Sequence, residues 1–203
     1  FANNKDKLGL SKTAYNFMGG IMHSAEALSA WFNPTINSYK RINAPVTASG
    51  ATWSPNTITY SGNNRTHMIR VPGPGRFELR LMDGATNPYL LQAGIIAAGL
   101  DGIEKKRSPG KPVFLNMYEE SHKVKGVKKL PNSLKKSLEH LNNNKILKSA
   151  FGKTVIDSYI KLKNKEIKKY NSFMTKKIGF RGTQQSKKAN IITQWEKDNT
   201  LDC

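Results

Sequence analysis

The residues with the clearest chemical potential lie in one short stretch, Arg76-Phe77-Glu78-Leu79-Arg80. Successive side chains of a β-strand point to opposite faces, so Arg76, Glu78 and Arg80 should share one face. Phe77 and Leu79 should lie on the other face, which suits a core. Two positive charges around one carboxylate fit a site that binds a phosphorylated, metal-bearing substrate. The pattern also fits an ordinary solvated strand face with an internal ion pair.

More arginines surround this stretch. Residues 66–71 and 76–81 read as two strands joined by the turn Pro72-Gly73-Pro74-Gly75, which predicts a hairpin. The hairpin would bring Arg65 and Arg70 close to the arginines of the second strand. The guanidinium fork pairs well with phosphate and carboxylate oxygens. The cluster therefore predicts an anion site.

The elements before the hairpin must position a further arginine, Arg41. A helix is predicted from a Ser11 cap to about residue 32, and it should end at Asn33-Pro34 because the residue before proline is driven out of the helical region. Segment 33–41 then reads as a loop that presents Arg41. The uncharged segment 44–60 is either a flap over a site or a plain surface connection.

After the hairpin, Asn87 and Pro88 form a well-matched helix start. The helix over 88–103 is apolar nearly all round and is expected to be buried, with Gly102 as a C-terminal cap. Later helices are predicted from Asn132 or Ser133 onward and over 154–178. These are expected to be followed by a polar loop at 179–192 and a tail that packs through Trp195.

The net charge of +19 is concentrated in the second half of the chain. Residues 1–104 hold 9 Lys/Arg and 6 Asp/Glu, whereas residues 105–203 hold 24 Lys/Arg and 8 Asp/Glu. Most of the excess is lysine on predicted amphipathic helices, without interleaved aromatics or a known binding motif. We therefore expect solvated helix faces and no nucleic-acid partner.

The length of 203 residues fits one domain or part of a larger protein. The single cysteine is Cys203, so no internal disulfide can form, which fits a reducing cytoplasmic compartment. No apolar run is long enough to span a membrane, so no membrane partner is expected.

Four motifs in order resemble the glutamine synthetase family. They are NPTINSYKR (33–41), NNRTHMIRVP (63–72), RFELR (76–80) and NPYLLQAGIIAAGLDGI (87–103). The resemblance covers about residues 1–170 and resumes in the tail, where it is closest to the branch of γ-glutamylmethylamide synthetases and related glutamine synthetases. It implies an α+β fold in which helices, including a helical C-terminal region, pack on an antiparallel sheet.

The family phosphorylates the γ-carboxylate of glutamate with ATP, and an amine then displaces the phosphate. The resemblance thus implies ATP, Mg²⁺ or Mn²⁺, glutamate and ammonia, a role in nitrogen assimilation and a homo-oligomeric ring. By position, Arg41 resembles the arginine that holds the α-carboxylate of glutamate. Arg65 resembles the arginine on the transferring phosphate, and Arg80 the arginine near the glutamyl phosphate.

The remaining positions concern nucleotide and metal. Arg70 and Arg76 resemble residues at the nucleotide phosphates, and Glu78 resembles a metal ligand. Tyr118 lies where some bacterial members carry a regulatory adenylylated tyrosine, but its neighbours differ and we expect it to be unmodified. Many members carry Glu-Ala-Pro in the flap, whereas this chain has Asn-Ala-Pro at 43–45. That change favours methylamine as an alternative amine.

The family's His-x-His segment and paired metal-binding glutamates lie upstream of the residues that match Phe1. The resemblance therefore implies the C-terminal part of the catalytic domain, with the active-site sheet and helices at 1–104 and a lysine-rich helical region and tail at 105–203. The N-terminal β-rich domain would be absent, and the piece alone is expected to be inactive. A weaker alternative is a non-enzymatic basic binding module.

Overall fold

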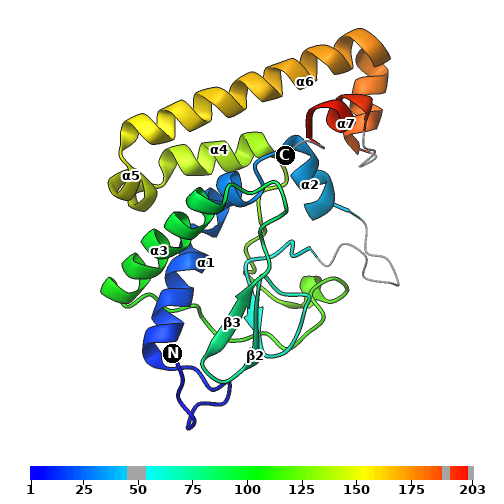
Figure 1. The fold of residues 1–203 in the computed structure, drawn as a ribbon. Helices are drawn as coiled ribbons and strands as arrows, with labels where there is room; N and C mark the ends of the chain where they lie inside the picture. The colour runs from blue at the N-terminus through cyan, green and yellow to red at the C-terminus, as the bar shows by residue number, and fades with distance from the viewer. Residues whose placement is uncertain (45–53, 189–192, 201–203) are drawn as a thin grey trace.

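The computed structural model describes residues 1–44, 54–188 and 193–200. Residues 45–53 of the predicted flap at 44–60 lie outside these residues. Helices dominate the fold and a small sheet lies toward one end, as the α+β prediction expected (Figure 1). The elements are α1 (Lys12–Phe32), α2 (Ile36–Ile42), β1 (Tyr60–Ser61), β2 (Ile69–Gly73), β3 (Arg76–Leu79), α3 (Pro88–Glu104), the short helix η1 (Ser121–Lys123), α4 (Leu134–Asn143), α5 (Lys145–Phe151), α6 (Lys153–Lys188) and α7 (Gln194–Thr200).

The core is organised around α1, which packs against both α3 and α4. Ser11 caps its start, with the hydroxyl accepting from the amide of Ala14 at 3.2 Å, and Asn33 ends it. Both predicted ends are therefore confirmed. Large side chains of α1 such as Trp31 and Phe32 are fully buried, and each such side chain contributes about 1.5–3 kcal/mol through removal of apolar surface from water.

The predicted hairpin is confirmed. Strands β2 and β3 are antiparallel, with Arg70 opposite Glu78. Gly75 turns the chain with φ +69°, a backbone conformation that suits glycine. The amide of Arg80 donates to the carbonyl of Met68 at 2.9 Å, which extends the pairing one step beyond β3. Strand β1 pairs with β2 in parallel. The sheet is therefore mixed, whereas a purely antiparallel sheet was expected.

The prediction that segment 33–41 forms a loop is wrong, because this segment contains most of α2. Thr35 and Ser38 form a capping box in which each side chain bonds the other residue's amide. Pro34 does end α1, but the chain starts a new helix directly afterwards. Arg41 is consequently held on a helix whose start is fixed by two hydroxyl groups.

The N-terminus of α3 is as predicted, since the Asn87 side chain accepts from the amides of Tyr89 and Leu90. The expected all-round burial of α3 is wrong. Tyr89 is 82% exposed and Ile96 53% exposed, while the buried residues are the small ones that face α1. Gly102 is not a cap either. It lies inside the helix at the contact with Gly20.

The C-terminal elements differ from prediction mainly in length. Ser133, not Asn132, caps α4. Helix α6 runs on to Lys188, so most of the polar loop predicted at 179–192 is helical, and residues 189–192 lie outside the described part. The tail packs as predicted, with the Trp195 ring 5.2 Å from that of Tyr170. No helix in the described ranges is long and apolar enough to cross a membrane.

Candidate active site

The hairpin places one carboxylate between two guanidinium groups. Glu78 Oε2 accepts from Arg70 Nη1 at 2.8 Å, and its other oxygen accepts from Arg80 Nη1. Arg70 reaches across the sheet because it is the register partner of Glu78, and its Nε donates to Asn63 Oδ1 at 2.7 Å. The flanking arginines are therefore Arg70 and Arg80, not the Arg76 and Arg80 that strand alternation predicted.

Glu78 remains ionised across the neutral range. Burial acts to raise its pKa, but hydrogen bonds and charges from Arg80 and Arg70 outweigh it and the pKa of Glu78 falls below its ordinary value. The shared carboxylate offsets the repulsion between the two arginines. Their remaining N–H groups are thus held in place before any anion arrives, which is the arrangement that favours binding of phosphate oxygens.

Arg41 lies at the junction of α1, α2 and the chain that follows β3. Its Nη2 donates to Asn33 Oδ1 at 2.9 Å and to the carbonyl of Leu81 at 2.8 Å. Burial lowers the pKa of Arg41, while the negative charge of Asp83 acts in the opposite direction. The Nε of Arg41 is buried without a hydrogen-bond partner among the described residues. One edge of this guanidinium is therefore fixed by the fold.

Tyr118, which the sequence indicated only as a possible modification position, lies near Arg41 and Arg80. Burial raises its pKa, while the positive charges of Arg80 and Arg41 act to lower it. The segment that carries Tyr118 is anchored near the hairpin, because the amide of Met117 donates to Thr66 Oγ1 at 3.0 Å. No local spacing could have placed residue 118 beside residues 41 and 80, because this contact depends on the path of a long loop.

The other two predicted arginines are not drawn into the row formed by Arg70, Glu78 and Arg80. Arg65 and Arg76 are both exposed, and neither forms an ion pair with another described residue. The hairpin therefore brings Arg70 and Arg80 together on Glu78 and leaves Arg65 and Arg76 with solvated side chains. Exposed guanidinium groups next to this row remain available to an anionic ligand.

The described residues do not form a metal site on their own. No group of three or more His, Cys, Asp or Glu side chains in the described ranges could hold a metal ion. Both oxygens of Glu78 are bound by arginines. His67 is also unsuitable, because its ring nitrogens contact Thr59 Oγ1 and the carbonyl of Leu115 inside the fold. A Mg²⁺ or Mn²⁺ ion would need ligands beyond these residues.

Known proteins resemble this chain over nearly its whole length. A family model described as "Glutamine synthetase, catalytic domain" matches residues 1–178. The glutamine synthetase of Rhizobium meliloti (strain 1021) is 50% identical over 202 residues, covering 100% of this chain and 42% of that protein. The glutamate–methylamine ligase of Methyloversatilis universalis is 44% identical over 175 residues, covering 84% of this chain and 39% of that protein.

Solved structures agree with these relatives. A structure titled "GmaS/ADP complex-Conformation 1" superposes with a TM-score of 0.79 at 47% identity, covering 100% of this chain and 42% of that one. A structure of GmaS without ligand gives a TM-score of 0.76 at 43% identity, covering 100% of this chain and 41% of that one. This chain spans about two-fifths of the length of these relatives and corresponds to a C-terminal portion of them. The chain thus belongs to the glutamine synthetase family.

Proposed function

We propose that this chain supplies the arginine-lined part of the active site of an ATP-dependent glutamate–amine ligase that uses ammonia. The observation that carries the proposal is the Arg70–Glu78–Arg80 row, with Arg41 and Tyr118 next to it. In the proposed reaction a γ-carboxylate oxygen of glutamate attacks the γ-phosphorus of ATP and ADP leaves. The amine nitrogen then attacks the acyl carbon, phosphate departs and the nitrogen loses a proton.

The arginines have distinct tasks in this proposal. Arg41 binds the α-carboxylate of glutamate, because one edge of its guanidinium is fixed by Asn33 and Leu81. Arg65 and Arg80 stabilise the negative charge that develops on the transferring phosphoryl group. Arg70 and Arg76 bind the phosphates of ATP. Glu78 orients two of these arginines, and its expected part in binding Mg²⁺ or Mn²⁺ needs further ligands from elsewhere.

The chain alone is proposed to be inactive, because its described residues include no group of three or more His, Cys, Asp or Glu side chains that could hold a metal ion. Its activity can be tested in a chimera in which residues 1–203 replace the matching portion of the Rhizobium meliloti glutamine synthetase. We expect formation of γ-glutamyl amide with ATP, glutamate, Mg²⁺ and ammonia by the chimera, and none by the isolated chain. Turnover by the isolated chain would contradict the view that its site is incomplete.

Methylamine is a second candidate amine. It is favoured by the similarity to GmaS structures and by the Asn-Ala-Pro sequence at 43–45, which removes a carboxylate from the position where many family members have glutamate. The specificity constants of the chimera for ammonia and methylamine decide between the two. A higher value for methylamine would overturn the proposal of ammonia and retain the ligase.

A further inference from the structure

A second concentration of positive charge surrounds a cavity away from the arginine row. The cavity has a volume of about 660 Å³ and lies between α1, the segment at 58–60 and the two loops at 107–113 and 124–128. None of the arginines assigned above to glutamate or ATP lines it. Its lining includes His23 and four cationic side chains, but no carboxylate from the described residues. The cationic residues are Arg107, Lys111, Lys125 and Lys128.

The loop at 107–113 is fixed against the helix and the sheet. A Cβ atom at Gly19 would come within 2.4 Å of the carbonyl oxygen of Arg107, so only glycine lets the loop lie this close to α1. The hydroxyl of Tyr60 donates to the carbonyl of Gly110 at 2.9 Å, and the amide of Val113 donates to the carbonyl of Tyr60 at 3.0 Å. This wall of the cavity is therefore built into the fold.

The loop at 124–128 is tied to the same segment of chain. The amide of Ile58 donates to the carbonyl of Lys128 at 2.9 Å, and Thr57 pairs with Lys129 in an antiparallel bridge. The backbone of Lys128 is thus held beside residues 57–58. Lysines from the two loops consequently face one cavity, although 17 positions separate Lys111 from Lys128 in the sequence.

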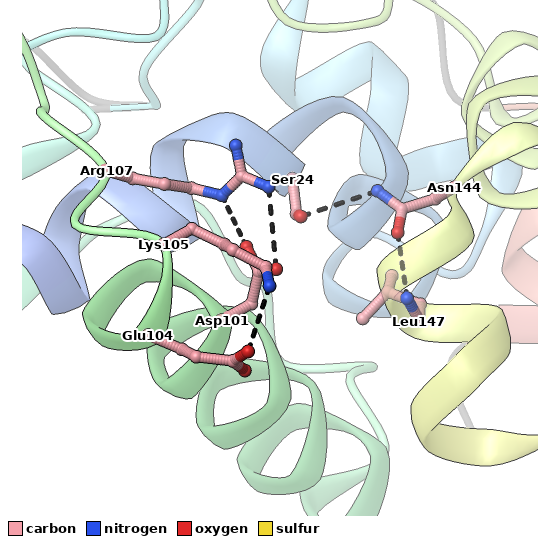
Figure 2. A network of polar contacts seen from close by, with 7 residues as sticks. All are labelled: Ser24, Asp101, Glu104, Lys105, Arg107, Asn144 and Leu147. Atoms are coloured by element: carbon pink, nitrogen blue, oxygen red, sulfur yellow. Dashed lines mark hydrogen bonds and ion pairs between the residues drawn. The ribbon is translucent and has the colours of Figure 1, made fainter.

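The positive charge around the cavity is only partly neutralised. Asp101 accepts from Nε of Arg107 and lies 3.5 Å from its Nη2, while Glu104 pairs with Lys105 (Figure 2). Lys111, Lys125 and Lys128 form no ion pair with any described residue. Burial lowers the pKa of His23, and the charges of Arg107 and Lys128 lower it further against the opposite effect of Asp101. The cavity is therefore electropositive.

Part of the lining is apolar. Apolar residues line the space: Met22 from α1, Ile58 from the segment at 58–60, and Val113, Val124 and Val127 from the two loops. A ligand that matched both features would carry a compact anionic group and a small apolar body. Several cations around one space favour a phosphate over a carboxylate. Each cation attracts the doubly charged phosphate more strongly than it attracts a singly charged carboxylate.

We propose that this cavity binds a small organic phosphate, with the phosphate beside Lys111 and Lys128 and the apolar body against Met22 and Val113. Nucleic acid is a poorer occupant. Single strands are bound along extended grooves with aromatic side chains that stack on the bases. Here the cations surround one cavity, and the aromatic residue in its lining, Tyr60, is buried with its hydroxyl engaged.

Titration calorimetry on the 203-residue chain tests the proposal with three probes: phenyl phosphate, inorganic phosphate and benzyl alcohol. We expect saturable binding of phenyl phosphate at one site. Inorganic phosphate should bind about tenfold more weakly because it lacks the apolar body, and benzyl alcohol should show no measurable binding because it lacks the charge. Equal affinity for the two phosphates, or no saturable binding of phenyl phosphate, would overturn the proposal.

Matched variants locate the binding. The double variant Lys111→Gln/Lys128→Gln should bind phenyl phosphate about tenfold more weakly, whereas Lys161→Gln/Lys168→Gln, which removes the same charge from the exposed face of α6, should bind as the parent does. Arg76→Gln should also bind normally, which separates this cavity from the proposed nucleotide site. All substituted residues except Arg76 are exposed lysines, and circular dichroism confirms that each variant folds. An equal loss in both double variants, or loss in Arg76→Gln alone, would refute the assignment.

A competition experiment tests nucleic acid as the alternative ligand of the cavity. A duplex or single-stranded oligonucleotide is expected not to displace phenyl phosphate near physiological ionic strength. The proposed organic-phosphate site would be overturned if the oligonucleotide displaced phenyl phosphate, if this displacement weakened steeply with salt, and if both double lysine variants abolished it equally. That result would indicate a nucleic-acid surface.

Discussion

Glu78 shows how one side chain can hold two arginines in position for the anion binding that we propose. Without it, Arg70 and Arg80 would repel each other across the hairpin, and each would have to be ordered when a ligand arrived. Hydrogen bonds to both guanidinium groups fix them in advance. Ordering a long charged side chain costs about 1.5–2 kcal/mol, so prior ordering leaves more of the interaction energy for the ligand.

The pH dependence of stability gives the first prediction. The pKa of Glu78 is lower in the folded chain than the ordinary value of 4.5, so its contribution to stability is complete above about pH 4.5 and is lost as the pH falls through the folded pKa. Glu78→Gln should lower the urea midpoint at about pH 7 and have a progressively smaller effect below about pH 4.5. Urea unfolding of both proteins across this range checks it.

The matched control is Glu104→Gln, which removes a carboxylate from an exposed pair in which Glu104 and Lys105 have side chains 72% and 58% accessible. Exposed ion pairs add little to stability, so the control should leave the midpoint nearly unchanged at every pH. If Glu78→Gln lowered the urea midpoint equally at every pH, the ion pairs of the Glu78 carboxylate would not be the source of its contribution to stability.

A substitution at Arg65 tests a role in catalysis separately from a role in folding. Its side chain is exposed and forms no ion pair with the described residues, so Arg65→Gln should change the free energy of unfolding by no more than about 0.5 kcal/mol. In the chimera it should lower kcat about 100-fold or more if it stabilises the transferring phosphoryl group. Steady-state kinetics and urea unfolding check the two statements. The exposed Lys161→Gln variant is the control, and activity of Arg65→Gln near the parent level would exclude the proposed role.

At the scale of elements, the close crossing of α1 and α3 determines how the helices stack. A Cβ atom at Gly102 would lie 2.2 Å from the carbonyl oxygen of Asn16 and 2.6 Å from the amide nitrogen of Gly20. Both neighbours are backbone atoms of a buried helix and cannot rotate away as a side chain could. The two helix backbones can therefore approach this closely only because residues 20 and 102 are both glycine.

Gly102→Ala should accordingly destabilise the chain by about 1–3 kcal/mol or more, despite the higher helix propensity of alanine. Gly84→Ala is the control, because a Cβ atom there would meet nothing within 4 Å and its φ is not positive. Urea midpoints of the two variants measure the difference. A stability gain in Gly102→Ala would mean that the crossing can widen without cost.

Local signals in the sequence predicted the elements whose determinants are local. The Ser11 and Asn87 caps and the Pro-Gly turn each act within four residues, and all three are present. Pro34 is followed by a helix and not by the predicted loop, because Thr35 and Ser38 form a capping box directly after the proline. The glycines in 179–188 suggested a loop, yet α6 continues through them. Helix propensity is a weak determinant that the surrounding chain overrides.

The site was predicted in outline and not in its contacts. Alternation along one strand placed Arg80 next to Glu78 but gave Arg76 as the second neighbour. The true partner, Arg70, depends on the register between two strands. The positions of Tyr118 and of Asn33 relative to Arg41 depend on loops and helix packing across the whole chain. Such long-range contacts follow from tertiary packing, on which local sequence patterns give no information.

At the scale of the whole molecule, the C-terminal tail is joined to the helix that carries Arg41. Glu196 is fully buried, and its Oε2 accepts from Lys40 Nζ at 2.6 Å and from the amide of Thr193 at 2.6 Å. Lys40 also lies 6.0 Å from the ring centroid of Tyr170 on α6. Lys40 thus links α2, α6 and α7, and it directly precedes Arg41 in the sequence.

Removal of one partner from this buried pair should release the tail. Lys40→Met removes the lysine from the Lys40–Glu196 pair, whose carboxylate is fully buried, and loss of one partner from a buried ion pair typically costs about 3–5 kcal/mol. Because α7 is a short helix at the end of the described chain and packs on α2 and on α6 near Tyr170, we expect the loss to appear as local opening. Hydrogen exchange of the amides at 193–200 should accelerate about 100-fold, while the amides of α1 keep their protection.

Lys161→Met, which removes an exposed lysine from α6, should leave exchange in the tail unchanged. The double variant Lys40→Met/Glu196→Leu should restore much of the protection, since the buried carboxylate is then removed together with its lysine partner. Unchanged exchange at 193–200 in Lys40→Met would show that apolar packing of Trp195 alone holds the tail.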